Sequence, residues 1–375
     1  MPVPGQVTRT GTAGFADRHS QDVAKDHFRG AGDLMLSSVG MGTYLGEADD
    51  QTDILVTQAL ERAVRGGINL IDTAINYRFE RAEKCIGRAI ENLIYSGEVS
   101  REELLICTKG GFVPVAKDAD EWFEREYVKG RDDGIQQSDL VGGMHCLHPA
   151  YIYDQIKRSR ANLGTETIDV YYLHNPEAQL GKVERKDFYD RLRKAFEVLE
   201  AAVSQAKIAC WGLATWSAFR TQPDKRDHLD LGEIVTLAEE AAGGREHHLR
   251  FIQLPFNLAM PEALLATQQW KGQAVPVLEI ARRLDLSVVA SASICQAQVI
   301  GQIPDTLAPI LGKKLSDAQR ALQFTRSSPG FVSALVGMKQ HEHVEENLAL
   351  CSYPPLDAKD YLQILNLGSG TRSDR

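Results

Sequence analysis

Four side chains in the first half of the chain have the types and the spacing needed to move a proton onto a carbonyl oxygen. In chain order they are Asp72, Tyr77, Lys109 and His174. A free tyrosine has a pKa of about 10, which is too high for efficient acid–base catalysis at neutral pH, and a neighbouring cation lowers it. Tyr77 is therefore the candidate proton donor or acceptor, with Lys109 as the cation and Asp72 as the partner of its ammonium. His174 is a candidate hydrogen-bond partner of the substrate oxygen.

No side chain in this set can supply a hydride, so a nicotinamide cofactor would have to provide it. The same residues also have plainer interpretations. A buried Asp–Lys pair often serves only the fold, and Tyr and His often close a core. Their position favours chemistry, because each of the four lies at or shortly after the end of a short apolar segment. These segments are 68–71, 104–107 and 168–173.

The short apolar segments belong to a regular alternation that predicts strands separated by amphipathic helices. The predicted strands are 34–39, 68–71, 104–107, 168–173, 208–213, 251–254, 286–290 and 331–336. The predicted helices are 53–65, 82–95, 150–163, 187–204, 231–241, 275–284, 316–326 and 343–349. Strands joined by helices pair in parallel. Eight such units in a row favour one closed (β/α)8 TIM barrel of the α/β class over two doubly wound domains.

Two connections are longer than ordinary turns, and both leave the carboxyl ends of predicted strands. They are the long βα loops after strands three and seven, 110–149 and 291–314. Barrel enzymes build their sites at this end, so we expect both loops to be lids or walls of a substrate site. The predicted organisation is a loosely held N-terminal arm at 1–33, a barrel oxidoreductase domain at 34–349 and a C-terminal tail at 350–375.

The charge balance limits the partners that the protein can have. The chain has 375 residues, with 42 Lys and Arg against 51 Asp and Glu, which gives a formal net charge of −9. Nucleic acids and anionic membranes are bound by clustered cations, so we expect neither as a partner. No apolar stretch suits a signal peptide or a membrane span, and the six cysteines include no CxxC pair. We therefore expect a cytoplasmic protein with reduced thiols.

The same segments carry motifs that resemble those of the aldo-keto reductases, over nearly all of 40–347. The family's GxNxxDTAxxY signature is similar to residues 67–77, its Thr-Lys pair after strand three to 108–109 and its DxxxLH pattern to 169–174. The resemblance implies a (β/α)8 fold and an NAD(P)(H)-dependent reaction without a Rossmann domain. It places the family's catalytic tetrad on Asp72, Tyr77, Lys109 and His174.

The resemblance also implies that a cofactor lies across the barrel mouth. NADP(H) is the expected cofactor, with NAD(H) as the alternative, because His343 stands where the family usually has Arg. Gln253 corresponds to the glutamine that holds the nicotinamide carboxamide, and Lys339 could meet a 2′-phosphate beside a helix N-terminus. The predicted cofactor-binding residues are Gly42, Thr43, Gln253, Gly337, Lys339, His343, Glu346 and Asn347.

Two nicotinamide contacts of the family are replaced in this chain. Ala214 and Thr215 stand in place of a Ser-Asn pair, and Ser291 stands where an aromatic residue commonly stacks on the nicotinamide. The candidates to replace that aromatic residue are Trp216, Trp122 and Phe123.

The expected function is reduction of an aldehyde or ketone, or oxidation of the corresponding alcohol or sugar, by hydride transfer with Tyr77 as general acid or base. Tyr44 and His145 are the predicted contacts to this small-molecule substrate, whose identity the sequence leaves open. Two other classes stay open: a catalytically weak, cofactor-sensing or regulatory barrel, and a metal-dependent barrel hydrolase, although no metal site is expected. A monomer is the default state, with a homo-oligomer as the alternative.

Overall fold

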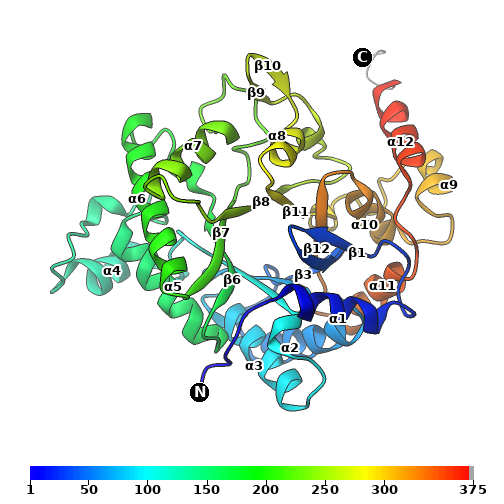
Figure 1. Ribbon diagram of the computed structural model, residues 1–375, viewed down its shortest axis with the longest axis horizontal. Helices are drawn as coiled ribbons and strands as arrows, with labels where there is room; N and C mark the ends of the chain where they lie inside the picture. The colour runs from blue at the N-terminus through cyan, green and yellow to red at the C-terminus, as the bar shows by residue number, and fades with distance from the viewer. Residues whose placement is uncertain (371–375) are drawn as a thin grey trace.

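Eight parallel strands close into a barrel at the centre of the molecule (Figure 1). The computed structural model describes residues 1–370 of the chain. The barrel strands are β3 (Val39–Gly42), β4 (Leu70–Asp72), β5 (Leu105–Gly110), β6 (Ile168–His174), β7 (Ile208–Ala214), β8 (Leu249–Pro255), β11 (Ser287–Ser291) and β12 (Phe331–Gly337). Around the barrel their hydrogen-bonded order is β11, β12, β3, β4, β5, β6, β7 and β8. The predicted (β/α)8 barrel is confirmed.

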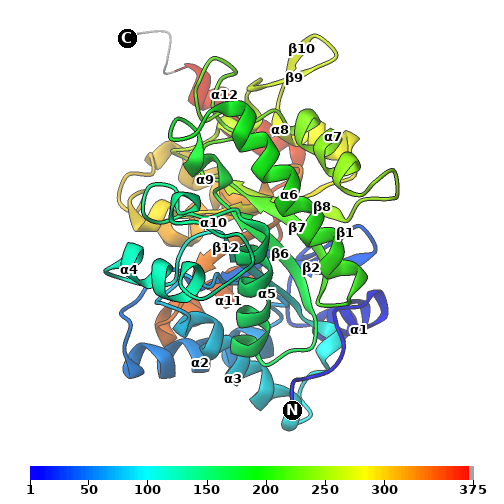
Figure 2. The ribbon, with the colours of Figure 1, turned by 90° about the vertical axis from the view of Figure 1, so that its left-hand side faces the viewer.

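Helices fill the connections between these strands and surround the barrel (Figure 2). The main ones are α2 (Asp50–Arg65), α3 (Arg81–Tyr95), α5 (Pro149–Leu163), α6 (Arg185–Ser204), α7 (Leu231–Ala241), α8 (Val277–Arg283), α10 (Asp317–Ser327) and α11 (His341–Cys351). Local signals set their ends. The Ser316 hydroxyl accepts a hydrogen bond from the Gln319 backbone N–H at the start of α10, and Gly66 ends α2.

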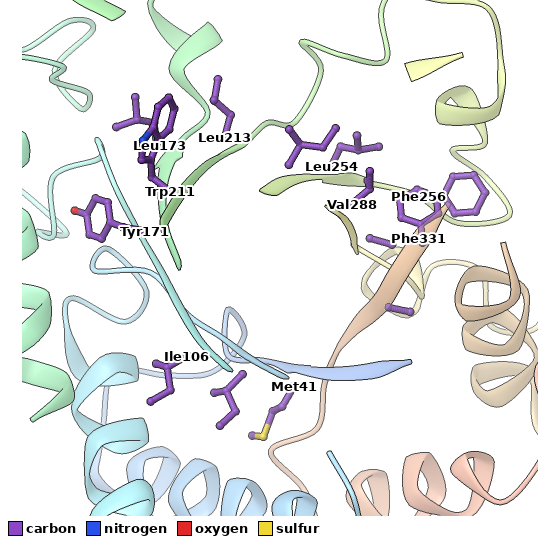
Figure 3. Close-up of a cluster of buried hydrophobic side chains, with 14 of the residues drawn as sticks. Met41, Ile106, Tyr171, Leu173, Trp211, Leu213, Leu254, Phe256, Val288 and Phe331 are labelled. Carbon is purple, nitrogen blue, oxygen red and sulfur yellow. The ribbon is translucent and has the colours of Figure 1, made fainter. Parts of the chain in front are cut away.

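Alternation along each strand divides the core into two layers, because successive side chains point to opposite faces of a strand. Figure 3 shows the outer layer, in which Ile106 and Tyr171 point away from β5 and β6 toward the helices. Their neighbours Cys107 and Tyr172 belong to a second buried cluster, on the inner side of the strands. The same alternation turns side chains at the carboxyl ends of β4, β5 and β6 into the barrel mouth.

The N-terminal residues are folded against the amino end of the barrel, so the prediction of a loosely held arm at 1–33 is wrong. They form α1 (Arg9–His19) and the first strand of a hairpin between β1 (Phe28–Ala31) and β2 (Leu34–Ser37). Phe15 is fully buried. Because α1 buries only Thr12 and Phe15, its apolar repeat is too sparse for an argument from periodicity.

The first predicted strand, 34–39, covers parts of two different elements. Its first part is β2, which pairs antiparallel with β1, and the barrel strand β3 begins only at Val39. The sequence of β3 is Val-Gly-Met-Gly, and its two glycines hide it from a search for apolar runs.

Both long connections lie where they were predicted, at the carboxyl ends of β5 and β11. The first contains α4 (Ala119–Phe123), η2 (Glu124–Val128) and η3 (Gln137–Asp139), and the second contains η6 (Cys295–Ala297), η7 (Asp305–Leu307) and α9 (Ala308–Leu311). A hairpin of β9 (Gln268–Trp270) and β10 (Gln273–Val275) after β8 was not predicted. Short helical turns also occur at η1 (Arg101–Glu103), η4 (Pro176–Gln179) and η5 (Glu262–Leu264).

The chain continues past α11 into α12 (Ala358–Gly370). Tyr361 of this helix is buried and stacks on Phe324 of α10, with ring centroids 5.3 Å apart. Residues 371–375 of the predicted tail lie outside the described residues. None of the helices within residues 1–370 has the length and apolar character that a membrane crossing requires.

Candidate active site

A cavity of about 780 Å³ opens at the carboxyl end of the barrel. Three of the four predicted catalytic residues line it, namely Asp72, Tyr77 and His174. The fourth, Lys109, is fully buried beside Asp72. The structure therefore brings together four residues that are spread over about a hundred positions of the sequence.

An ion pair between the ends of β4 and β5 is the centre of this group. Lys109 Nζ lies 2.5 Å from Asp72 Oδ1 and donates a second hydrogen bond to the Thr73 carbonyl oxygen at 2.8 Å. Gln253 Nε2 donates to Asp72 Oδ2, also at 2.8 Å. Burial alone would lower the pKa of Lys109, but the Asp72 carboxylate and Tyr77 outweigh it and raise the pKa above its ordinary value. The ammonium therefore stays charged in a buried place.

Tyr77 lies next to this ammonium, with Lys109 Nζ 5.1 Å from the ring centroid. Burial raises the pKa of Tyr77 above its ordinary value, and the charge of Lys109 opposes that rise without cancelling it. Lys109 thus lowers the pKa of Tyr77 as expected, but loss of hydration outweighs the attraction, so the pKa still lies above its ordinary value. Tyr77 carries its proton at neutral pH, as a proton donor must.

His174 faces Tyr77 across the cavity floor, with ring centroids 5.7 Å apart. Burial, helped by the charge of Lys109, holds the pKa of His174 well below its ordinary value. The ring is therefore neutral at pH 7 and keeps one donor and one acceptor nitrogen. Its Nδ1 is buried and has no hydrogen-bond partner within the described part of the chain.

His145, the other predicted substrate contact besides Tyr44, does not line the cavity. It is buried beneath His174, and its Nε2 lies 2.8 Å from the His174 carbonyl oxygen while Gln179 Nε2 donates to its Nδ1 at 3.1 Å. This pair of bonds makes Nε2 the protonated nitrogen. Burial lowers the pKa of His145 to about 4, so the ring is neutral. Its position in the long loop suggested a substrate contact, but its backbone pairs with Phe112 and turns the ring inward.

Most of the predicted cofactor-binding residues line the cavity. They are Gly42, Thr43, Gln253, Gly337, Lys339 and His343. Thr43 Oγ1 donates to the Asp72 carbonyl oxygen at 3.2 Å, so it also ties β3 to β4. Tyr44 lines the cavity as well, and its ring contacts the Tyr77 ring edge to face at a centroid distance of 5.0 Å.

Glu346 and Asn347 do not line the cavity. The Glu346 carboxylate accepts a hydrogen bond from the Ser316 hydroxyl, and its carbonyl oxygen accepts one from Gln319 Nε2 at 2.7 Å. Asn347 is buried in α11. Glu346 thus joins α11 to α10, and the predicted contact of both residues with a cofactor stays a prediction.

Among the cavity residues that received no definite role from the sequence, three follow closely on barrel strands. Phe112, Thr215 and Trp216 line the cavity, whereas Trp122 and Phe123, the other aromatic candidates, do not. Thr215 Oγ1 is buried without a hydrogen-bond partner among the described residues. Their position in the sequence could have identified them, because each of the three comes one or two residues after the end of a barrel strand.

Within residues 1–370, no group of three or more His, Cys, Asp or Glu side chains is placed to hold a metal ion. All six cysteines are free thiols, and four of them are buried.

Comparison with known proteins agrees with this arrangement. Residues 38–227, about half of the chain, match the model of the Aldo/keto reductase family. The NADH-specific methylglyoxal reductase of Escherichia coli is 29% identical over 213 residues, which are 55% of this chain and 55% of that protein. The chain thus matches about half the length of that relative. The "probable voltage-gated potassium channel subunit beta" of Arabidopsis thaliana is 23% identical over 348 residues, 87% of this chain and 91% of that protein.

Solved structures with the same fold cover nearly the whole chain. An aldo/keto reductase from Klebsiella pneumoniae, solved in complex with NADP and acetate, superposes with a TM-score of 0.61 and covers 92% of this chain and 95% of its own. At 19% sequence identity this likeness shows the fold and nothing finer.

Proposed function

The chain belongs to the aldo/keto reductase family, and on that premise we propose that it is an NAD(P)(H)-dependent oxidoreductase that interconverts an aldehyde or ketone and the corresponding alcohol. The observation that carries the proposal is the meeting of four side chains at one cavity. These are Asp72, Tyr77, Lys109 and His174. The fold alone would not support the proposal, because barrels of this kind serve many unrelated reactions.

In the direction of reduction, Tyr77 donates its phenolic proton to the carbonyl oxygen as that oxygen gains negative charge. Because burial raises the pKa of Tyr77, the phenol is the form present at neutral pH. Lys109 stabilises the phenolate that is left behind, and Asp72 and the Thr73 carbonyl oxygen hold its ammonium in place. In the direction of oxidation, the phenolate of Tyr77 accepts the proton of the alcohol.

His174 orients the reacting oxygen. Its ring is neutral at pH 7, since burial holds its pKa well below the ordinary value. A neutral imidazole can donate a hydrogen bond to a carbonyl oxygen without protonating it, and a fixed donor beside developing negative charge favours the transition state. The placement of His174 opposite Tyr77 gives the oxygen two donors from two sides.

A bound nicotinamide dinucleotide supplies the hydride in reduction and accepts it in oxidation. The residues around the cavity fit such a group. Thr215 Oγ1 lacks a partner among the described residues, and together with Gln253 it would hold the carboxamide. At Gly42 and Gly337, an added Cβ would meet no atom closer than 3.9 Å, so these positions leave open room along the cavity wall.

We propose NADP(H) as the cofactor, with NAD(H) as the alternative. Lys339 and His343 line the cavity at the N-terminus of α11, where unpaired backbone N–H groups and the helix dipole favour a phosphate. Similar proteins use both cofactors, since the Klebsiella structure holds NADP and the E. coli relative is NADH-specific. Fluorescence titration of the purified protein with NADPH and NADH decides between them. Lys339→Ala should weaken NADPH binding by about ten-fold, the effect of one charged hydrogen bond, and leave NADH binding unchanged.

The experiment that tests the proposed function is a turnover screen. Wild-type protein is mixed with NADPH or NADH and a panel of aldehydes and ketones, and with the oxidised cofactors and the corresponding alcohols. Absorbance of the reduced cofactor reports turnover in both directions. The proposal expects turnover with at least one member of the panel. Cofactor binding without turnover across the whole panel would contradict it.

A second candidate function is a cofactor-sensing or regulatory barrel with weak catalysis. The observation that favours it is the similarity to the "probable voltage-gated potassium channel subunit beta" of Arabidopsis thaliana, which covers 87% of this chain. The complete set of four catalytic side chains favours the enzyme instead. Tight cofactor binding with no turnover in the screen above would select the regulatory alternative.

A further inference from the structure

The short segment that joins Tyr77 to α3 has an unusual backbone. The three residues directly after Tyr77 all have positive φ angles, of 48° at Arg78, 56° at Phe79 and 71° at Glu80. Residues other than glycine rarely adopt this left-handed conformation, because their Cβ atom comes too close to the following carbonyl oxygen, and they adopt it singly rather than in a row. We call residues 78–80 the left-handed turn.

The left-handed turn costs free energy, so it persists only where its surroundings hold it. Backbone hydrogen bonds hold part of it. The Glu80 N–H donates to the Ile75 carbonyl oxygen at 2.9 Å, and the Ala82 N–H donates to the Tyr77 carbonyl oxygen at 3.4 Å. All four residues belong to one short segment, so these bonds tie the turn only to its own neighbours. Side chains tie it to the rest of the fold.

Arg78 joins the left-handed turn to α2. Its side chain is only 2% exposed. Arg78 Nη1 donates to Asp53 Oδ1 of α2 at 2.6 Å, and Nη2 donates to Cys85 Sγ of α3 at 3.2 Å. Asp53 Oδ2 in turn lies 2.6 Å from Nη2 of Arg81. The charge of Arg78 is therefore paired inside the protein, and its guanidinium is held between two helices.

Glu80 joins the left-handed turn to α5. Its side chain is 15% exposed, and its carboxylate accepts a hydrogen bond from Arg158 Nε at 2.8 Å. Lys84 Nζ lies 3.5 Å from the other carboxylate oxygen. Arg158 also lies over the Trp122 ring, with 5.6 Å between its Cζ and the ring centroid. Because Trp122 belongs to the long loop after β5, this contact links the turn through α5 to that loop.

Phe79 has the same left-handed backbone as its two neighbours but lies differently. Its side chain is 42% exposed and does not line the cavity. The turn therefore has two residues whose charged side chains are bonded to other helices and one residue between them that is largely turned to solvent. A comparison of Phe79 with Glu80 can separate the effect of backbone strain from the effect of the ion pairs.

We propose that Arg78 and Glu80 are positioning residues for Tyr77, and that their bonds to α2 and α5 fix the phenol where proton transfer requires it. Tyr77 is joined to the left-handed turn by one peptide bond, so a shift of the turn moves the phenol relative to Lys109 and His174. A general acid must lie within hydrogen-bond reach of the reacting oxygen, and a small displacement lowers the rate. This inference rests on the proposed function, because it concerns the general acid of the same reaction.

The first test replaces Glu80 and measures turnover of a carbonyl substrate taken from the screen above. Glu80→Gly adopts a positive φ without strain but loses the bond to Arg158. It should lower kcat by about ten-fold, because the phenol loses its fixed position. The KM for the cofactor and the midpoint of urea unfolding should stay close to wild type, since relief of strain offsets the lost ion pair. Glu80→Gln keeps an acceptor for Arg158 Nε and should recover most of the rate.

The second test replaces Arg78. Arg78→Met keeps the apolar stem and removes the guanidinium, and Asp53 retains Arg81 as its counter-charge, so the variant should fold. Its kcat should also fall by roughly ten-fold, for the same reason. A wild-type kcat in this variant would remove Arg78 from the proposal.

Phe79→Gly is the matched control. It gives the neighbouring position the same backbone freedom as Glu80→Gly and leaves both ion pairs in place, so its kcat should equal that of wild type. Amide hydrogen exchange of residues 75–82 gives a second measurement that needs no turnover. Exchange should rise more in Glu80→Gly than in Phe79→Gly, because only the former frees the turn from α5.

The outcomes separate this proposal from the one on which it rests. With active wild-type enzyme, an unchanged kcat in Glu80→Gly or an equal loss of kcat in Phe79→Gly would overturn the positioning role and leave the reductase proposal standing. A loss of kcat in Glu80→Gly that only follows a loss of stability would do the same. Cofactor binding by the wild-type protein without turnover of any substrate would overturn both.

Discussion

Two buried aspartate–cation pairs lie at opposite ends of the same barrel, and their surroundings differ. At the amino end, Asp169 at the start of β6 is paired with Arg101 at 2.8 Å. It also accepts hydrogen bonds from the backbone N–H groups of Val7 and Ile106, both at 2.7 Å. This carboxylate joins the N-terminal segment, η1, β5 and β6, and it does not line the cavity at the carboxyl end of the barrel.

At the carboxyl end, Asp72 and Lys109 form a pair of similar burial with different neighbours. Their remaining bonds go to Gln253, which lines the cavity with Asp72, and to the Thr73 carbonyl oxygen. The ammonium also lies beside the Tyr77 ring. Burial and pairing alone therefore do not distinguish the proposed catalytic pair from the pair that serves the fold. The distinction comes from what the rest of each group contacts.

The largest effect is expected when the Tyr77 hydroxyl, which lies beside the Asp72–Lys109 pair, is removed. Tyr77→Phe keeps the ring and deletes only the hydroxyl, so kcat/KM should fall by about a thousand-fold, within the range for general acid catalysis. The midpoint of urea unfolding and the affinity for NADPH should stay as in wild type. Steady-state kinetics, urea titration and fluorescence titration measure the three quantities. Activity within a few-fold of wild type would show that another group donates the proton.

A smaller effect is expected when His145 is replaced. This residue lies near the carboxyl end of the barrel, but its ring is hydrogen-bonded within the protein and does not line the cavity. His145→Leu removes the donor to the His174 carbonyl oxygen, so His174 should lose its fixed position and kcat should fall by roughly ten-fold at an unchanged KM for the cofactor. His145→Gln can still donate to that oxygen and should recover most of the rate. Equal losses in both variants, in step with equal losses of stability, would make His145 a purely structural residue.

The smallest expected effect is that of pH, because the rate of reduction should not change with pH near neutrality. The pKa of Tyr77 is raised and that of His174 is lowered well below its ordinary value, so neither group titrates near neutrality. The reduction needs the phenol, which is lost only as pH rises through the raised pKa of Tyr77. The rate of reduction should therefore be flat from about pH 6 to pH 9 and fall only at higher pH. An inflection near pH 7 in kcat would contradict the assigned protonation states.

Much of the arrangement of the candidate site follows from the sequence. The ends of the strands are easy to find, and side chains alternate strictly between the two faces of a strand. Once β5 and β6 are placed, Lys109 shares the inner side with Cys107, and His174 shares it with Tyr172. The (β/α)8 fold follows from eight repeats of one pattern. The two long loops also follow, since nothing but length is needed to find them.

The parts that the sequence did not predict depend on contacts between distant segments. His145 is turned away from the cavity by a backbone bridge to Phe112 that no local pattern records. The packing of the N-terminal residues depends on single contacts such as Phe15 and the bond from Val7 to Asp169. The direction of the pKa shift of Tyr77 depends on whether burial, which raises the pKa, outweighs the charge of Lys109, which lowers it. Only the structure gives the degree of burial.

The most direct test of the difference between the two pairs is one matched substitution at each end, with turnover and unfolding free energy measured in both variants. Asp169→Asn should lower the free energy of unfolding by about 3–5 kcal/mol, because it leaves Arg101 buried without a counter-charge, while the folded fraction keeps its kcat. Asp72→Asn should lower kcat by at least about 100-fold, and it should also cost stability, because it leaves the buried Lys109 ammonium without a counter-charge. Equal losses of kcat in the folded fraction of the two variants would contradict the assignment of one pair to the fold and the other to catalysis.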